Sequence, residues 1–497
     1  MNNQDQKQNT RQPSRRLSRR WRNILLIALI VLLVLGGVLY SQRHQIHQVL
    51  QALGIGVPPV QPVSITPLAL SPNATGAGQV SSADWTMYHY DAARGGFVAN
   101  APDPASLANL WKRSLDGAVY AEPLVIDRQV IVATESNTLY SLDARSGQVQ
   151  WHTTIGNPVP LSDLPCGDID PLGITGTPVY DPHTGLVFAV AEVRGPAHIL
   201  VGVDLKTGQV KVRRIIDPPG ANPQVHQQRA ALALSGNRVY IAFGGLYGDC
   251  GDYHGMVVAS RTDGSGALLT YQVPTQREAG IWATPGPVID AQGNLYVTVG
   301  NGAATGGDWD HSDSVLRLSP TLQLEDAFAP QSWANDNAAD LDLGSLGLVL
   351  LPNGLLFIQG KSNQGYLLRA DHLGGIGGQI QSISACSGGA YGGAAVSGQM
   401  AFIPCADGLR QIKLNGATSI TTGWQAPSQV TGSPIVGGNT VYSLAPGAGT
   451  LYALDAATGS TRATISVGQT SRFATPALAH NTLFIGTMSG IVAVAIQ

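Results

Sequence analysis

Short apolar stretches separated by turn residues recur from about residue 84 to the C-terminus. Typical stretches are RVYIAF, NLYVTVG, GLLFIQG, TVYSLA and TLFIGT, and Gly, Asn or Asp residues surround them. Runs of this length that are rich in β-branched and aromatic residues and end at turn formers predict strands rather than helices. The pattern therefore predicts an all-β body.

A longer unit repeats within this pattern. SLDARSGQVQWHTTIG contains a strand, a turn from Asp143 to Gly147 and a second strand with Trp151, and further copies are built on Asp204 and Asp455. We expect each aspartate to bind the backbone of its own turn and the glycine four residues later to take a positive φ. Such a unit cannot bury its faces alone, so the copies must stack on one another.

Eight short segments open apolar strands at a similar spacing, and each is followed by a turn and further strands. Four strands in each of eight units predict an eight-bladed β-propeller of four-stranded antiparallel blades. The openers are Glu122-Pro123, Thr177-Pro178, 229–234, Thr284-Pro285, 343–351, 391–398, Ser433-Pro434 and Thr475-Pro476.

The last unit, which ends in GIVAVAIQ, contains only three strands. LANLWKRSL (Leu107–Leu115) offers the missing outer strand, which would join both ends of the body in one blade and remove an open sheet edge. Trp111 then occupies the position of Trp151, and Trp424 is a third instance. We interpret these tryptophans as core packing.

The first 84 residues have a different composition. We predict a basic cytoplasmic tail (1–22), a transmembrane signal anchor (23–42), a flexible Pro/Ser/Gly-rich linker (43–84) and the propeller (85–497). The run Ile24–Tyr40 contains no charge and approaches the roughly 17–25 residues of a spanning helix. A cleaved signal peptide and a buried core helix are the alternatives. The run exceeds a typical signal-peptide core, and no small-residue cleavage site follows it.

The basic flank predicts a single-pass protein of the cell membrane, anchored through residues 24–40, with a cytoplasmic N-terminus and an extracytoplasmic propeller. The chain has 497 residues, of which 12% are charged, and a net charge of −3, so nothing favours nucleic-acid binding. Export permits disulfides. We predict the pair Cys386–Cys405 at neighbouring strand ends of one blade and the pair Cys166–Cys250 in loops of adjacent blades, with a redox role as the alternative.

These repeats resemble the quinoprotein-type (pyrroloquinoline quinone repeat) β-propellers over about Asp84–Gln497. That superfamily includes quinone-dependent alcohol dehydrogenases and a lipoprotein that helps to assemble outer-membrane proteins. The repeat of the type LDxxTGxxxW and the Thr-Pro openers carry the resemblance. They imply the fold without fixing one function.

The resemblance to the dehydrogenases also implies site residues. IWATPGPVIDAQGNLYVTVGNG is similar to the segment in which Trp282 would form the floor beneath the quinone and Asn301 would coordinate the metal. ANDNAADLDLGS places Asp340 as catalytic base and metal ligand, and Asp342 matches the extra carboxylate of lanthanide-using relatives. Lys361 in GKSNQGYLLRAD would contact the quinone oxygens. The implied cofactors are pyrroloquinoline quinone with calcium or a lanthanide, which would polarise a carbonyl while a carboxylate takes the alcohol proton.

Two parts of the dehydrogenase pattern are missing. The vicinal cysteine pair expected near the first blade is replaced by VYAEP, and the blade expected to supply a metal-binding glutamate reads FGGLYGDCGDYHG. Asp249 or Asp252 would have to substitute for that glutamate. We therefore interpret the protein as a membrane-tethered binding or scaffolding module for an envelope protein or peptide ligand. The alternative is a quinone- and metal-dependent alcohol or aldehyde dehydrogenase, which convergence of Asn301, Asp340, Asp342 and Lys361 would favour. A third interpretation is carbohydrate or polymer binding at the channel mouth.

Three further polar segments have simpler interpretations. GGDWDHSDS contains Asp308, Asp310, His311 and Asp313. The spacing of its carboxylates suits calcium, but its glycines favour a solvated loop. Asp168 and Asp170 fit an Asp-Pro turn. Residues 226–229 (HQQR) precede a strand and are expected to line the channel mouth.

Overall fold

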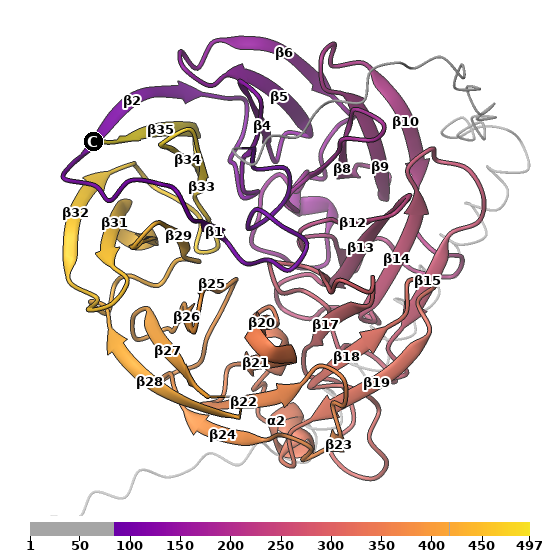
Figure 1. Cartoon of the computed structure of the whole chain (residues 1–497). Helices are drawn as coiled ribbons and strands as arrows, with labels where there is room; N and C mark the ends of the chain where they lie inside the picture. Colours follow the sequence, from indigo (N-terminus) through magenta and orange to yellow (C-terminus); the bar gives the residue numbers. More distant parts are fainter. Residues whose placement is uncertain (1–83, 417) are drawn as a thin grey trace, which may run out of the picture. The chain divides into compact units, whose positions relative to one another are not determined.

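The computed structural model describes residues 84–416 and 418–497, which form eight sheets of four or five strands arranged in a ring (Figure 1). Blade 1 contains β3 (Leu124–Ile126), β4 (Gln129–Ala133), β5 (Thr138–Asp143) and β6 (Val149–Thr154), and blade 2 contains β7 (Val179–Asp181), β8 (Leu186–Val193), β9 (Ala197–Asp204) and β10 (Val210–Ile215). Blade 3 contains β11 (His226–Gln227) and β12 (Ala233–Ser235), which both pair with β13 (Arg238–Gly245), followed by β14 (Met256–Arg261) and β15 (Leu269–Gln272). Blade 4 contains β16 (Val288–Ile289), β17 (Leu295–Val299), β18 (Ser314–Leu318) and β19 (Leu324–Ala329). Blade 5 contains β20 (Val349–Leu351), β21 (Leu355–Gln359), β22 (Gln364–Arg369) and β24 (Gln381–Ser384), and blade 6 contains β25 (Ala395–Ser397), β26 (Met400–Ile403), β27 (Arg410–Asn415) and β28 (Ser419–Gln425). Blade 7 contains β29 (Ile435–Gly437), β30 (Thr440–Ala445), β31 (Thr450–Asp455) and β32 (Thr461–Ser466). Blade 8 contains β33 (Ala477–Ala479), β34 (Thr482–Thr487), β35 (Gly490–Ile496) and β2 (Leu107–Ser114).

The remaining elements are short. β1 (Phe97–Val98) pairs in parallel with β29, and β23 (Gly375–Ile376) pairs in parallel with β19. One α-helix, α2 (Trp333–Ala338), and four 3-10 turns, η1 (Leu161–Asp163), η2 (Leu343–Ser345), η3 (Pro352–Gly354) and η4 (Pro446–Ala448), complete the described residues. The predicted eight blades and all eight predicted openers are confirmed, since each opener lies at or just before the first strand of a blade.

The ring closes as the incomplete last unit predicts. β2 pairs antiparallel with β35, from Leu107 opposite Ile496 to Ser114 opposite Gly490. Figure 1 shows the indigo β2 beside the yellow β35 in one blade. Pairing the first long strand of the body with the last leaves no open edge between blades 1 and 8.

The predicted cytoplasmic tail (1–22), the membrane anchor (23–42) and residues 43–83 of the linker lie outside the described residues. None of the helices in residues 84–416 and 418–497 combines the length and the apolar character that crossing a bilayer requires.

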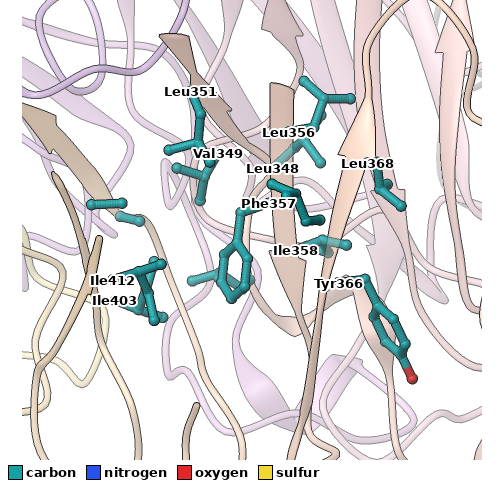
Figure 2. Close-up of a cluster of buried hydrophobic side chains, with 14 of the residues drawn as sticks. Leu348, Val349, Leu351, Leu356, Phe357, Ile358, Tyr366, Leu368, Ile403 and Ile412 are labelled. Carbon is teal, nitrogen blue, oxygen red and sulfur yellow. The ribbon is translucent and has the colours of Figure 1, made fainter. Parts of the chain in front are cut away.

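The core consists of apolar clusters between neighbouring blades. Figure 2 shows one of them, in which Phe357 from β21 lies near Ile403 and Ile412 from the next blade. These three side chains have at most 1% of their surface exposed. Each blade therefore buries its faces against its neighbours, as the repeat requires.

The repeated turn forms as predicted. Asp143 Oδ1 accepts hydrogen bonds from the backbone N–H groups of Arg145 and Ser146 at 3.1 and 2.9 Å, and Gly147 has φ +65°. At Asp455 the backbone N–H groups of Ala457 and Thr458 donate in the same way, and at Asp204 that of Thr207 does. The residues of each turn therefore supply the hydrogen bonds that close it.

The tryptophans of the repeat pack against the apolar clusters, as expected, and they also join adjacent blades. Trp111, Trp151 and Trp424 are half-buried, and each packs on the turn glycine of the next blade while its Nε1 donates to a carbonyl of that turn. The three hydrogen bonds measure 3.0, 2.9 and 3.0 Å. The turn glycine is thus required both for its positive φ and for the space that the indole occupies.

This double requirement predicts the effect of one substitution. A Cβ at Gly147 would lie 2.6 Å from Trp111 Cε3, whereas a Cβ at Gly236, with a similar φ of +56°, would meet no atom within 4 Å. Gly236→Ala is expected to cost about 1 kcal/mol of unfolding free energy from backbone conformation alone, and Gly147→Ala about 3 kcal/mol because overpacking adds to it. Urea denaturation of the two variants measures the difference. Equal losses would mean that the indole moves aside at no cost.

Candidate functional site

The predicted site residues all lie on one face of the ring, which we call the mouth face. It carries the loops between the second and third strands of each blade and the segments that enter each first strand. Trp282, Asp340 and Asp342 precede the first strands of blades 4 and 5, and Asn301 and Lys361 follow the second strands of the same blades. Because strands alternate in direction, all five positions come to the same end of these two neighbouring blades.

Four of the predicted residues form one connected centre. Lys361 Nζ lies 2.6 Å from Asp340 Oδ1 and 2.5 Å from Asp342 Oδ2. The backbone N–H of Asn301 donates to Asp342 Oδ1 at 2.7 Å. We call Asp340, Asp342 and Lys361 the acidic–lysine centre. We expect from the sequence that convergence of these residues with Asn301 favours an enzyme, and the structure shows that they converge.

Burial distinguishes the two carboxylates of this centre. The Asp342 side chain is 6% exposed and that of Asp340 is 68% exposed. Burial raises the pKa of Asp342, and the charge of Lys361 opposes that rise. Burial alone would lower the pKa of Lys361, but the charges of Asp342 and Asp340 and their hydrogen bonds raise it above its usual value. Lys361 therefore remains a cation at neutral pH, held between two carboxyl groups.

Gly300 lets Trp282 approach this centre. A Cβ on Gly300 would collide with Asp342 Oδ1 and lie 3.1 Å from Trp282 Nε1. The indole and the buried carboxylate are therefore separated by little more than this glycine. The structure thus brings the fifth predicted residue beside the other four.

Residues from two other blades contact Trp282. The Arg229 guanidinium carbon lies 5.6 Å from the centre of the Trp282 ring and 4.3 Å from that of Phe473, and the two rings meet edge to face at 6.4 Å. Phe473 precedes blade 8 and Trp282 precedes blade 4, so this contact spans the centre of the ring. We call Arg229, Trp282 and Phe473 the central cluster. Arg229 Nε is buried without a hydrogen-bond partner among the described residues, a state that native proteins rarely leave unexplained.

Segment 226–229 only partly fulfils its expected role. His226 and Gln227 form β11 and are 3% and 4% exposed. Gln228 is also buried, so of the four residues only Arg229 reaches the central cluster.

The loop expected to be solvated contains a buried acid. Asp313 has no exposed surface, and its Oδ1 accepts the backbone N–H of Leu343 at 2.8 Å, directly beside Asp342. Burial raises the pKa of Asp313 to about 9, with the charge of Asp342 adding to the effect. The sequence does not indicate this burial, because a Gly-rich acidic loop can have the same sequence pattern whether it is exposed to solvent or buried by other residues.

The substitutes for the missing glutamate have other roles. Asp249 Oδ1 accepts the Tyr253 hydroxyl at 2.6 Å, and Asp252 is exposed. Burial and the charge of Asp249 raise the pKa of Tyr253. Glu278, which the sequence did not single out, is close enough to Asp249, Asp342 and Asp340 for their charges to add to the rise in pKa that burial causes.

Both predicted disulfides are present. Cys386 and Cys405 have Cα atoms 5.3 Å apart, and Cys166 and Cys250 have Cα atoms 6.1 Å apart. All four cysteines of the chain are paired. Both bonds lie on the mouth face, where they hold loops close to the site.

The residues do not fit the metal-dependent quinone centre that the resemblance implies. Within residues 84–416 and 418–497, no group of three or more His, Cys, Asp or Glu is arranged to hold a metal ion. The ammonium of Lys361 already bridges Asp340 and Asp342. The carboxylates of Asp340 and Asp342 are thus engaged by a lysine where the resemblance implies a metal ion.

Comparisons with known proteins agree with this fold. Residues 74–297 match the family model described as outer membrane protein assembly factor BamB. The quinohemoprotein alcohol dehydrogenase of Comamonas testosteroni is similar in structure, with a TM-score of 0.67, 15% identity and coverage of 83% of this chain and 80% of that one. A europium-containing methanol dehydrogenase has a TM-score of 0.66 and 14% identity, with coverage of 83% of this chain and 98% of that one. BamB of Moraxella catarrhalis has a TM-score of 0.55 and 13% identity, with coverage of 78% of this chain and 99% of that one. No curated protein matches the chain in sequence. The identities are low, so these structures establish the fold alone. The chain is thus an eight-bladed β-propeller, and its residues 74–297 match the family model of the BamB-type assembly factor.

Proposed function

We propose that the propeller is a non-catalytic binding module that takes an anionic ligand with a flat group at the central cluster. The observation that carries this proposal is the ion pairing of Lys361 with both Asp340 and Asp342. A general base must be free to take a proton, whereas the candidate base Asp340 is already paired with a cation. The centre is therefore better suited to hold charge in place than to exchange protons.

The chemistry of the central cluster suggests the ligand. A guanidinium plane and two aromatic rings offer stacking surfaces, and the unpartnered Nε of Arg229 offers a donor. Arginine in such a setting binds carboxylates and planar groups well. A flat, carboxylate-bearing ligand would satisfy both features at once.

Calorimetric titration of the full-length protein with pyrroloquinoline quinone, a flat tricarboxylate, tests this proposal. We expect binding that does not depend on added calcium or lanthanum and no alcohol-dependent dye reduction. Arg229→Ala should weaken binding by about tenfold or more, because a charge-assisted hydrogen bond is lost. Asp340→Asn, the matched control in the acidic–lysine centre, should leave binding unchanged.

The second candidate is a quinone- and metal-dependent alcohol or aldehyde dehydrogenase, favoured by the convergence of Asn301, Asp340, Asp342 and Lys361. Binding that requires metal, that Asp340→Ala and Asn301→Ala both abolish, and that supports turnover would establish this function instead. An absence of binding with and without metal would contradict both candidates at this site.

We also propose that residues 24–40 anchor the chain in the cell membrane and that the propeller lies outside the cytoplasm, where its ligand would be an envelope component. The two disulfides support this location, since such bonds persist in oxidising compartments. Protease treatment of intact cells tests it, and a fully protected propeller would contradict it.

A further inference from the structure

A cleft lies between blades 7 and 8 on the mouth face, away from the acidic–lysine centre of blades 4 and 5. Its volume is about 570 Å³, and its walls are residues 446–449 of blade 7, residues 468–470 and 472 before blade 8, and Thr431. This volume is typical of sites for small molecules. Arg472 is the only charged residue in its walls.

The guanidinium of Arg472 is oriented by aromatic side chains. Its carbon lies 4.0 Å from the centre of the Tyr391 ring and 5.6 Å from that of Phe473. Arg472 is exposed, and no hydrogen bond or ion pair joins it to another residue of the described ranges. Stacking engages the face of a guanidinium and leaves its N–H groups, which lie in the plane, free to donate. Arg472 is thus an oriented cation without an anion.

The other walls of the cleft are polar and small. Thr470 is 6% exposed, and its hydroxyl has no hydrogen-bond partner among the described residues. Gln469 is exposed, and a Cβ on Gly447 or Gly468 would meet nothing within 4 Å. Hydroxyl and amide groups bind ligand hydroxyls, and the glycines leave room for a ring. The walls contain only two apolar side chains, Pro446 and Ala448, so a greasy ligand would gain little here.

We infer that this cleft binds a small hydroxylated carboxylate of the acidic-sugar class. Arg472 takes the carboxylate through two parallel N–H donors, a geometry that matches one planar anion. Thr470, Gln469 and the glycine backbone face the hydroxyl groups. Arg472 contacts Phe473 of the central cluster, but none of the three central-cluster residues lines this cleft, so its ligand does not depend on the proposed function.

Calorimetric titration of the full-length protein with glucuronate and galacturonate tests this inference, with glucose and inorganic phosphate as comparison ligands. We expect both uronates to bind and glucose to bind at least about tenfold more weakly, because glucose lacks the carboxylate. Arg472→Ala should remove uronate binding, and Arg472→Lys should retain part of it because the charge remains. Gly447→Phe should also weaken binding, because it fills the cleft at a position with free space.

Lys211→Ala is the matched control, since Lys211 is an exposed cation on β10 of blade 2. It should bind uronates as the unchanged protein does. Three results would overturn the inference: no uronate binding, uronate binding that survives Arg472→Ala, or phosphate binding as tight as that of uronate. A uronate affinity that falls in Arg229→Ala and not in Arg472→Ala would place the ligand at the central cluster and would also overturn it.

Discussion

Replacing Cys166 and Cys250 by alanine is expected to lower the free energy of unfolding by about 4.5 kcal/mol, whereas replacing Cys386 and Cys405 costs about 3 kcal/mol. The first pair closes a loop of 84 residues and the second a loop of 19. A cross-link restricts the unfolded chain more when the loop is longer, because more conformations are lost. The difference between the two pairs therefore arises in the unfolded state.

Equilibrium denaturation in urea, followed by tryptophan fluorescence and circular dichroism, measures both losses. The denaturant slope should rise in the variant without the longer loop, because its unfolded state becomes less compact. A larger loss for the shorter loop would show that contacts of the folded blades, and not loop closure, determine the contribution of each bond. Ligand binding at the mouth face provides a second readout, since Cys250 lies in the same loop as Asp249 and Tyr253.

The fold could be predicted from the sequence because its determinants are local and repeated. The turn from Asp143 to Gly147 is closed by hydrogen bonds among its own residues, and the copies at Asp204 and Asp455 form similar bonds. Closure of the ring could be predicted because a unit that lacks its fourth strand needs a partner, and Leu107–Leu115 was the available strand. The joining role of Trp111 was missed, because position in a repeat does not show which neighbour a side chain touches.

The candidate site was predictable only up to the positions of its residues relative to the strands. Asn301 and Lys361 follow second strands and Asp342 precedes a first strand, so the topology alone brings them to one end of adjacent blades. The pairing of Lys361 with two carboxylates depends on side-chain orientation, which no pattern encodes. The contact of Phe473 with Trp282 joins segments almost 200 residues apart across the ring, and nothing in either segment indicates it.

Replacing His198 by glutamine is expected to destabilise the protein by about 3–5 kcal/mol at pH 6, with a loss that shrinks toward pH 10. His198 is 1% exposed, with Nδ1 2.6 Å from Asp217 Oδ1 and Nε2 3.4 Å from Glu192 Oε1. Burial alone would lower the pKa of His198, but the charges of Glu192 and Asp217 and their hydrogen bonds raise it from 6.5 to about 10. The substitution leaves the buried carboxyl group of Glu192 and the partly buried one of Asp217 without their cation, which is the costly way to break a buried ion pair.

The sign of the pH dependence separates charge from packing in this prediction. Because the pKa of His198 is higher in the folded than in the unfolded state, its stabilisation is complete below about pH 6.5 and is lost as the pH rises to about 10. His226 is the matched control, since burial lowers its pKa and its contribution must fall as the pH drops below 6.5. Urea denaturation of His198→Gln and His226→Gln between pH 5 and 10 should therefore give stability differences of opposite slope. A His198→Gln loss that stays constant with pH would assign the effect to the lost edge-to-face contact with Phe243, whose ring centre lies 5.0 Å from that of His198, and not to the ion pair.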